Sequence, residues 1–321
     1  SIDIVIDATG SPAAGIQHVL ACCEYGKHIV MVNVEADALA GPLLARKAAE
    51  AGIVYSLAYG DQPALICEMV DWARASGFEV IAAGKGTKYL SSYHQSTPAT
   101  VWSHYGISES DASDGLQFPP CGVDDLARVL RPRSSGGVLA HRGQVEVISS
   151  LERDERPVFR DLRWGVYVTM AGDSEYVRRC FKEYGLVTDP SGEFTSMYKP
   201  FHLIGLELGI SIASVGLRAE PTGAPIAWHA DVVATAKRDL KVGERLDGEG
   251  GFTVYGRLMP ASDSLRLGGL PLGLAHGIKL KRAVQAGVPL RWSDVQIDTS
   301  EPSVRFRKSM EDSFAKEVNG A

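Results

Sequence analysis

The chain has 321 residues, 45% of them hydrophobic, and a formal net charge of −6 at pH 7. This length allows two or three domains with cores of their own, and the negative charge, with both signs interspersed, argues against a general affinity for nucleic acid or anionic membrane. No apolar run reaches the length of a membrane span, and five scattered cysteines favour a reduced, cytoplasmic protein over a disulfide framework or a zinc site.

The first residues predict a strand, a helix and a second strand. Residues 2–8 are apolar and rich in β-branched side chains, residues 11–26 have helical spacing and end in glycine, and residues 28–32 are again apolar. This order predicts a right-handed βαβ unit of a parallel sheet. Ligands of such sheets bind beyond the carboxyl ends of the strands, so we expect a crevice at residues 8–10 and 33–35.

A dinucleotide-binding domain normally begins with a strand, a glycine-rich turn and a helix N-terminus that holds the pyrophosphate. No G-x-G-x-x-G follows a predicted strand, and the chain begins with serine. The sequence therefore predicts that the first half of such a domain is missing from this chain.

Periodicity and glycine or proline stops predict the remaining elements. Asp61 and Pro63 suit the N-cap and the first turn of a helix. Residues 91–120 lack periodicity, as functional or disordered loops do. The predicted helices are 37–51, 63–75, 124–130, 174–184 and 206–218, and the predicted strands are 53–58, 78–83, 144–151, 162–170, 232–237 and 252–258.

The last third of the sequence has a different residue pattern. Residues 220–225 have the composition of a linker. Arg238–Glu244 and Lys281–Gly287 echo each other, each with basic residues, apolar residues and a glycine before a strand. This pattern predicts a compact β-rich module. Residues from Arg305 onward form a charged tail, expected to be a terminal helix or a disordered end.

Several of these motifs resemble one family. Ile4–Gly10, Gly26–Asn33 and Gly41–Gly52 resemble the second half of the nucleotide domain of homoserine-dehydrogenase-like oxidoreductases. Gly84-Lys85-Gly86-Thr87-Lys88-Tyr89 falls where that family has its Asn-Gly-Thr-x-Asn-Tyr substrate segment. Residues 206–217 match the family's helix that returns to the nucleotide domain.

Residues 230–297 resemble the SAF module, a small β-clip domain. Together with Val32–Asp37 and Ala58–Pro63, this combination is similar to the subgroup of 1-deoxy-D-xylulose 5-phosphate reductoisomerase-like enzymes. The resemblance implies an α/β fold whose Rossmann-type parallel sheet lacks its first half. Its expected parts are the second half of an NAD(P)-binding domain at 1–57 with the return helix at about 206–219, an α+β catalytic and oligomerisation domain at 58–205, a SAF domain at 226–300 and a tail at 301–321.

The sequence departs from the family at two places. Val34 stands where the family has a lysine, which argues against ordinary homoserine dehydrogenase activity. The family's Asp and Lys, one helical turn apart, have no counterpart between Trp102 and Pro119. We therefore expect a second missing segment, near Asp114-Gly115.

Two lysines follow the predicted strand at 78–83. The ammonium groups of Lys85 and Lys88, in a glycine-lined concavity, suit a substrate phosphate or carboxylate, and one could protonate a developing alkoxide. Thr87 could add a hydroxyl. The alternative interpretation is a solvated turn with two surface lysines.

At the other strand ends, Thr9-Gly10 and Asn33 are expected to bracket the nicotinamide and its ribose, with an ordinary β–α turn as the alternative. Glu35 fits equally a helix-start acid and a substrate-site carboxylate. Asp61 fits an N-cap better than a catalytic base, and His94, His104 and His202 fit structural or surface roles better than ligand binding.

The expected site residues fall into three groups. The catalytic group is Lys85, Lys88, Asn33, Glu35 and Asp61. The substrate-binding group is Gly84, Thr87, Gln62, Lys199 and His202. The cofactor-binding group is Ala8, Thr9, Gly10, Asn33, Val34 and Glu207. A divalent metal ion, Mg²⁺ or Mn²⁺, would need hard carboxylate ligands, for which Glu35, Asp61 and Glu207 are candidates without an identifying spacing.

The resemblance implies an NADPH-dependent oxidoreductase that isomerises and reduces 1-deoxy-D-xylulose 5-phosphate to 2-C-methyl-D-erythritol 4-phosphate, an isoprenoid precursor. The alternatives are an NAD(P)-dependent dehydrogenase of another hydroxy acid or sugar phosphate, and a non-catalytic sugar-binding or assembly protein. The expected partners are a phosphorylated or anionic small molecule and further copies of the chain in a homo-oligomer, with no nucleic acid and no membrane.

Overall fold

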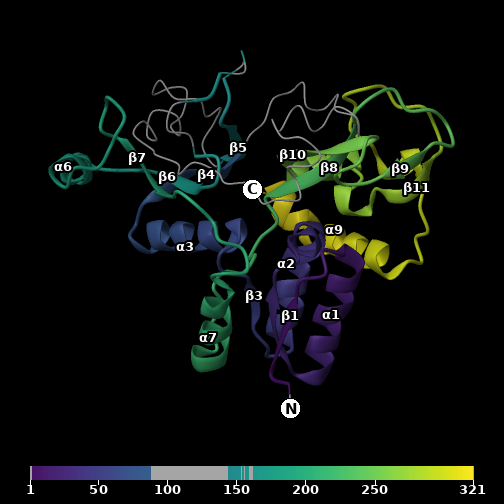
Figure 1. The fold of residues 1–321 in the computed structure, drawn as a ribbon, viewed down its shortest axis with the longest axis horizontal. Coiled ribbons are helices and arrows are strands. Elements are labelled where there is room, and N and C mark those ends of the chain that lie inside the picture. Colours follow the sequence, from purple (N-terminus) through teal and green to yellow (C-terminus); the bar gives the residue numbers. More distant parts are fainter. Residues whose placement is uncertain (1, 88–143, 153, 155, 159–161, 321) are drawn as a thin grey trace, which may run out of the picture. The chain divides into compact units, whose positions relative to one another are not determined.

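The structure is a computed structural model that describes residues 2–87, 144–152, 154, 156–158 and 162–320. The chain divides into two compact units, with described residues 2–56 and 214–320 in unit 1 and the remainder, from residue 57 to residue 213, in unit 2 (Figure 1). Several predictions lie outside the described residues. They are Lys88, Tyr89, His94, His104, the helix at 124–130 and the missing segment near Asp114-Gly115.

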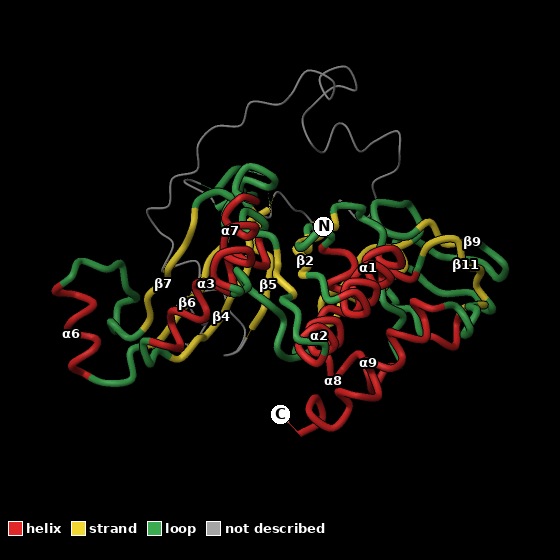
Figure 2. Tube along the Cα trace, turned by 90° about the horizontal axis from the view of Figure 1, so that it is seen from below, coloured by secondary structure: helices red, strands yellow, loops and turns green. Residues whose placement is uncertain are grey.

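Unit 1 begins with alternating strands and helices. They are β1 (Ile4–Asp7), α1 (Pro12–Tyr25), β2 (His28–Met31), α2 (Val34–Glu50) and β3 (Tyr55–Leu57). The strand order is β1-β2-β3, and β1 runs parallel to β2 with Ile4 opposite His28. Helices α1 and α2 lie side by side (Figure 2). The predicted α/β class with a parallel sheet is confirmed.

The ends of α1 are set by local chemistry. The Ser11 hydroxyl accepts a hydrogen bond from the Ala14 amide at 3.3 Å, Pro12 occupies the first turn, and Gly26 ends the helix with φ 61°. Helix α2 starts at Val34, three residues before the predicted start at Asp37. The reason is that Asn33 caps this helix, a role common for asparagine.

The C-terminal module of unit 1 consists mainly of short strands. They are β8 (Ala230–Ala236), β9 (Arg245–Asp247), β10 (Val254–Pro260), β11 (His276–Leu280) and β12 (Val295–Gln296), with helix α8 (Ala261–Leu267) and single turns η4 (Leu272–Leu274) and η5 (Trp292–Asp294). Strand β10 pairs antiparallel with β8, and β11 pairs antiparallel with β9 and β12. One core, which includes Leu240, Leu246 and Leu280, joins these elements.

The two segments that echo each other in sequence pair with each other in the structure. The Leu240 amide donates to the Val284 carbonyl at 2.8 Å, and the Val284 amide donates back at 3.0 Å. Gly243 and Gly287 have almost the same positive φ, 78° and 77°. Only glycine adopts this backbone readily, which explains why both segments end in it.

The C-terminal tail forms helix α9 (Pro302–Gly320). Its Arg307 side chain has 0% exposure. The guanidinium group donates to Asp231 Oδ2 at 2.6 Å, to the Leu39 carbonyl at 2.9 Å and to Glu311 Oε1 at 3.1 Å. It also lies 4.7 Å from the ring centroid of Trp228. Arg307 thus ties α9 to β8 and α2 inside unit 1.

Unit 2 is built on a four-stranded sheet in the order β5-β4-β6-β7. Its elements are α3 (Gln62–Ala75), β4 (Glu79–Thr87), β5 (Gln144–Ser149), β6 (Val166–Ala171), α6 (Glu175–Glu183), β7 (Phe194–Lys199) and α7 (Leu208–Arg218), whose last residues belong to unit 1. Strand β4 is parallel to β5 and antiparallel to β6. Helix α3 packs Leu65 and Met69 against Val166 and Val168.

The predicted end of the strand at Ala83 is wrong, because β4 continues to Thr87 and is paired on both sides. Its glycines suggested a turn, but Gly86 serves a different purpose. A Cβ atom there would lie 1.8 Å from the Leu162 carbonyl oxygen, so another part of the backbone presses on the strand. Lys85 therefore lies within a strand and not in a solvated turn. Strand β7 was not predicted.

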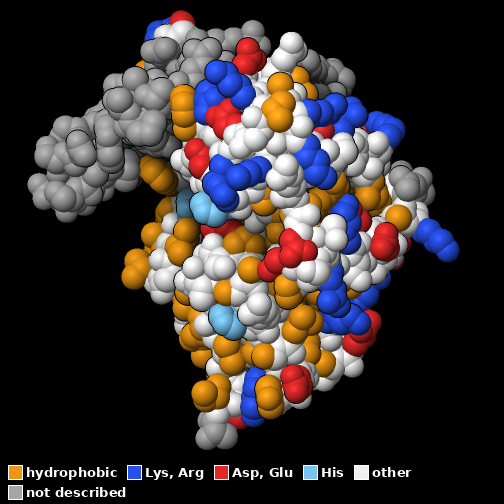
Figure 3. Space-filling view, turned by 90° about the vertical axis from the view of Figure 1, so that its right-hand side faces the viewer, with side chains coloured by type: hydrophobic (Ala, Val, Ile, Leu, Met, Phe, Trp, Pro, Cys, Tyr) orange, Lys and Arg blue, Asp and Glu red, His pale blue; other side chains and the backbone are white. Residues whose placement is uncertain are grey.

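Among the described residues, no helix combines the length and the apolar character needed to cross a membrane. The face seen in Figure 3 mixes Lys and Arg side chains with Asp and Glu. This mixture agrees with the interspersed charges of the sequence.

A half-buried acid in unit 1, Asp37, makes stability depend on pH. Asp37 accepts a hydrogen bond from the Tyr55 hydroxyl at 2.7 Å, and burial raises the pKa of Asp37 to about 6, although that hydrogen bond lowers it. The folded state therefore holds this proton more tightly than the unfolded chain, so its contribution to stability is full below about pH 4 and is lost as pH rises through 6.

We expect Asp37→Asn, which cannot ionise, to be more stable than wild type by about 1–3 kcal/mol at pH 7.5 and nearly equal to it at pH 4. Urea unfolding of both proteins across this pH range measures the difference. A constant difference from pH 4 to 7.5 would contradict the burial of an ionisable Asp37.

Candidate functional site

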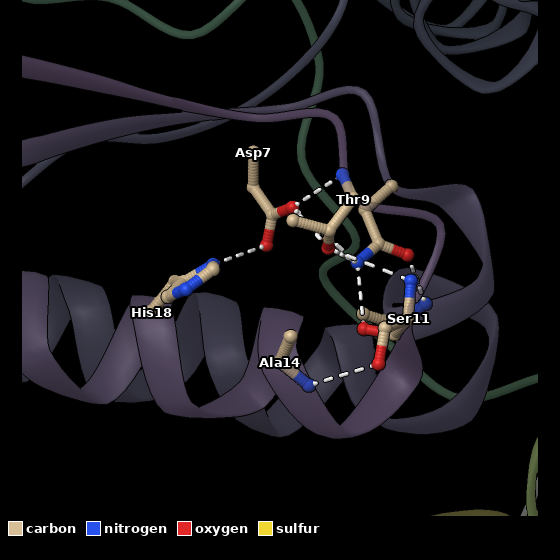
Figure 4. A network of polar contacts seen from close by, with 7 residues as sticks. Asp7, Thr9, Ser11, Ala14 and His18 are labelled. Carbon is tan, nitrogen blue, oxygen red and sulfur yellow. Dashed lines mark hydrogen bonds and ion pairs between the residues drawn. The ribbon is translucent and has the colours of Figure 1, made fainter.

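Unit 1 has a polar cluster at the carboxyl ends of β1 and β2 (Figure 4). Asp7, 1% exposed, accepts hydrogen bonds from the Thr9 amide at 2.9 Å and the Thr9 hydroxyl at 2.7 Å. His18 Nδ1 lies 3.0 Å from the other carboxylate oxygen of Asp7. Burial raises the pKa of Asp7, but the hydrogen bonds from Thr9 and His18 outweigh it and hold the pKa below its usual value.

Asn33 connects this cluster to α2. Its amide nitrogen donates to the Ser11 carbonyl at 2.8 Å and to the Thr9 hydroxyl at 3.1 Å, and its oxygen accepts from the Ala36 amide at 3.1 Å. A Cβ atom on Gly15 would lie 2.7 Å from the Asn33 amide nitrogen, so α1 packs tightly on this side chain. Asn33 holds the β1 turn against the start of α2, and its direct contact with a ligand stays a prediction.

The predicted cofactor residues Ala8, Thr9, Gly10 and Val34 all lie at this edge. Gly10 has φ 63°, and a Cβ atom placed on it would meet nothing within 4 Å. The backbone is therefore open there, which fits the approach of a nicotinamide and its ribose. Glu35 lies in the first turn of α2. Burial and the charge of Glu35 raise the pKa of Glu249, so an acid of the C-terminal module lies near Glu35.

Asn33→Ala is expected to lower the free energy of unfolding by about 1–2 kcal/mol, because it removes the α2 cap and leaves the buried Ala36 amide without its acceptor. Asn33→Ser keeps an oxygen that can cap the helix but cannot bridge to Ser11, so we expect a smaller loss. Thermal unfolding ranks the variants. Equal losses would show that the bridge to Ser11, and not the cap, accounts for the contribution of Asn33.

Unit 2 has a second cluster, formed around Asp61 and Lys85. Asp61 is the N-cap of α3, is 5% exposed and accepts a hydrogen bond from the Gln62 amide at 2.8 Å. Burial raises the pKa of Asp61, although the Gln62 amide, His202 and Lys85 act to lower it. Burial also lowers the pKa of Lys85, although the charge of Asp61 acts to raise it.

The half-buried Lys85 ammonium group has no hydrogen-bond acceptor or ion-pair partner among the residues that the structure describes. Burial outweighs the attraction between Lys85 and Asp61, so it brings their two pKa values closer together. Shifts in these directions are typical of acids and amines that take part in proton transfer.

His202 and Gln62 adjoin this cluster. His202 Nδ1 lies 2.6 Å from the Trp164 carbonyl oxygen, and His202 Nε2 lies 2.6 Å from Gln62 Nε2. A proton on Nδ1 satisfies the carbonyl and leaves Nε2 to accept from the Gln62 amide. These two contacts hold the His202 ring in this cluster.

Lys199 and Glu207 pair with each other at 2.6 Å. The Lys199 ammonium also lies 4.9 Å from the ring centroid of Tyr59, and Glu207 accepts from the Leu203 amide at 3.3 Å. The charge of Lys199 is thus already compensated. Its substrate role and the cofactor role of Glu207 stay predictions, as do those of Gly84 and Thr87, which lie in β4.

The predicted metal has no clear ligand set. In the described parts of the chain, no three His, Cys, Asp or Glu side chains are grouped so that they could hold a metal ion. Of the candidate ligands, Glu35 belongs to unit 1, and Asp61 and Glu207 belong to unit 2. A divalent metal ion stays a prediction.

Sequence reasoning did not identify Asp7 and His18 as functional candidates. An acid as the last residue of β1 is the signal that could have found Asp7, because polar side chains at strand ends line ligand crevices. His18 lies seven residues into α1, and only the fold brings it to Asp7.

Two protein families match parts of the chain. Residues 60–113 and 109–208 match the family described as oxidoreductase DRL, catalytic domain. Residues 231–296 match the SAF domain family. The two pieces of the first match meet at 109–113, in the stretch where the sequence predicts a missing segment. A comparison with curated proteins gives no match.

Three solved structures each align with 70% of this chain. They are a "putative oxidoreductase" from Bacteroides fragilis (16% identity, 73% of that chain, TM-score 0.25), the "putative oxidoreductase yvaA" from Bacillus subtilis (14%, 74%, 0.27) and the "YPO2259 putative oxidoreductase" from Yersinia pestis (17%, 73%, 0.28). TM-scores this low carry no argument about shared activity.

The Asp61–Lys85 cluster falls within the segment that matches the DRL catalytic domain, and strands β8 to β12 form the segment that matches the SAF domain. The predicted oxidoreductase and SAF assignments are confirmed at this level, and closeness to the reductoisomerase-like enzymes stays a prediction. Residues 60–208 are therefore similar to an oxidoreductase catalytic domain of the DRL type, and residues 231–296 to a SAF domain.

Proposed function

We propose that this protein is an NADPH-dependent oxidoreductase whose unit 1 holds the cofactor and whose unit 2 holds an anionic substrate. The observation that carries the proposal is the half-buried ammonium of Lys85, which has no partner among the described residues and interacts electrostatically with the buried acid Asp61, inside the segment that matches an oxidoreductase catalytic domain. Such a pair supports the gain or loss of a proton on an oxygen whose carbon is reduced or oxidised.

A nicotinamide bound at the carboxyl ends of β1 and β2 would supply hydride there, with Thr9, Gly10 and Val34 along it. Lys85 would bind the substrate carbonyl oxygen and stabilise the negative charge that develops on it. The proton that completes the hydroxyl would come from Lys85, and solvent would restore it, with the Asp61 carboxylate favouring the ammonium form. His202, held by Trp164 and Gln62, would orient the substrate near Asp61.

For the substrate, we propose 1-deoxy-D-xylulose 5-phosphate. Its carbon skeleton would rearrange while Lys85 binds the vicinal oxygens, and the aldehyde formed would then be reduced to the alcohol. The support is the resemblance of Val32–Asp37 and Ala58–Pro63 to the reductoisomerase-like subgroup. The alternative, a dehydrogenase of another hydroxy acid or sugar phosphate, uses the same Lys85 and Asp61 for one proton transfer without the rearrangement.

Loss of NADPH absorbance, followed with the purified protein, tests both forms of the proposal. Turnover with 1-deoxy-D-xylulose 5-phosphate, and a branched product in the mass spectrum, would support the reductoisomerase. Turnover only with hydroxy acids or sugar phosphates would support the dehydrogenase. No turnover with any of these, in a protein whose melting temperature NADPH does not raise, would contradict an oxidoreductase of this kind.

A further inference from the structure

Asp61 stands at the end of a tight turn in unit 2. The Asp61 amide donates to the Ala58 carbonyl at 3.1 Å, which closes a four-residue turn. Gly60, at the third position, has φ 93°, as a type II turn requires. The amide of Tyr59, at the second position, points away from this closing hydrogen bond and needs an acceptor elsewhere.

Ser211 of α7 supplies that acceptor. The Tyr59 amide donates to Ser211 Oγ at 2.8 Å, and the same hydroxyl donates to the Leu57 carbonyl at 3.3 Å. Ser211 is 0% exposed, so water does not compete for these bonds. One hydroxyl thus connects the last residue of β3 to the turn that follows it.

The opposite side of the turn is also closely packed. A Cβ atom on Gly60 would lie 2.7 Å from the Leu203 carbonyl oxygen and 2.9 Å from Glu207 Cβ. The segment that leads into α7 therefore presses on Gly60, while Ser211 of that helix holds Tyr59. Asp61, the next residue, has little freedom to move away from Lys85.

We propose that Ser211 is a positioning residue for Asp61: its hydroxyl fixes the Ala58–Asp61 turn and thereby holds the Asp61 carboxyl beside Lys85. This inference rests on the proposed function of Asp61 and Lys85 as a proton-transferring pair. Its bonds to the Tyr59 amide and the Leu57 carbonyl let Ser211 act on the pair through the backbone of the turn.

A merely structural serine would contribute stability and leave the electrostatics of Lys85 unchanged. The charge of Asp61 acts to raise the pKa of Lys85, so the reactivity of the Lys85 amine reports how close Asp61 stays. The rate at which an amine reagent such as acetic anhydride modifies Lys85, read peptide by peptide in a mass spectrometer as pH is varied, gives this pKa without any turnover.

Three variants make the test. Ser211→Ala removes the hydroxyl that bonds Tyr59 and Leu57. Asp61→Asn removes the negative charge, and its labelling midpoint measures the full effect of that charge on the pKa of Lys85. Ser214→Ala is the matched control: this serine lies three residues further along α7, is 3% exposed and donates to the Glu220 carbonyl at 2.9 Å. This variant also loses a buried hydroxyl, but not one that bonds the Ala58–Asp61 turn.

We expect Ser211→Ala to lower the labelling midpoint of Lys85 in the same direction as Asp61→Asn, by about half a pH unit, so that labelling below the midpoint is roughly threefold faster. Ser214→Ala should match wild type. An unchanged midpoint in Ser211→Ala, or in Asp61→Asn, would overturn the inference. If wild type shows no NADPH turnover, the proposed function fails, and the labelling midpoints still decide the role of Ser211.

Discussion

Lys85→Met is expected to lower kcat for NADPH-dependent turnover by about 10³-fold or more. The substitution removes the ammonium that would stabilise charge on the substrate oxygen and donate a proton to it, and each of these effects alone is worth about 10²–10⁴-fold in enzymes. Methionine keeps much of the length of the side chain and suits the half-buried position in β4, so the fold should persist.

Two further variants show whether that loss of kcat is specific to Lys85 and whether it depends on proton transfer. Lys182→Met removes an exposed lysine of α6 and should leave kcat within about twofold, because surface charges contribute little. Lys85→Arg keeps the positive charge but cannot release a proton near neutral pH, so it should recover binding more than kcat. A Lys85→Met enzyme with near wild-type kcat would remove Lys85 from the mechanism.

Arg307→Met should destabilise the protein by about 3–5 kcal/mol, the largest effect on stability that we expect. The guanidinium group is completely buried and is the partner of Asp231, which is 1% exposed. It also donates to the Leu39 carbonyl of α2 at 2.9 Å. Its removal leaves the buried Asp231 carboxylate without its positive partner, while the Ser264 hydroxyl and the Val232 amide still donate to it.

Urea unfolding, monitored by far-ultraviolet circular dichroism, measures this loss. Lys308→Met is the matched control, because this neighbouring side chain is 41% exposed and pairs with the same Glu311 at 2.7 Å. We expect the control to cost less than about 1 kcal/mol. Equal losses in the two variants would mean that burial of Arg307 adds nothing to the stability of unit 1.

Much of the fold follows from local sequence. Ser11, Pro12 and Gly26 mark both ends of α1, and Asp61 marks the start of α3, because caps and helix stops depend on residues that are adjacent in the chain. The repeated sequence pattern that ends at Gly243 and Gly287 likewise corresponds to two similar turns, which pair with each other in the C-terminal module.

Features that depend on distant parts of the chain were not predicted. In strand β4, the Leu162 carbonyl lies so close to Gly86 that no side chain would fit there. A glycine in the sequence does not reveal this contact. The tail was expected to be a terminal helix or a disordered end. In the sequence, Arg307 resembles a surface charge in a polar segment. Tertiary contacts such as its bond to Asp231 make α9 an integral part of unit 1.

The candidate site shows the same division. Lys85 and Asp61 were selected from their places beside predicted strand and helix ends, but their altered pKa values depend on burial that no spacing reveals. Lys199 was expected to bind substrate, and its pairing with Glu207 depends on a contact between β7 and the segment before α7. The hydrogen bond from the Tyr59 amide to Ser211 joins residues more than 150 positions apart.

Transfer of deuterium from NADPH, labelled at the nicotinamide carbon that donates hydride, is the most direct test of the proposed oxidoreductase. The purified protein would be incubated with labelled NADPH and 1-deoxy-D-xylulose 5-phosphate, and the product examined by mass spectrometry. The account predicts one deuterium on the reduced carbon of the product with wild type and almost none with Lys85→Met. Unlabelled product, or transfer that Lys85→Met leaves intact, would contradict it.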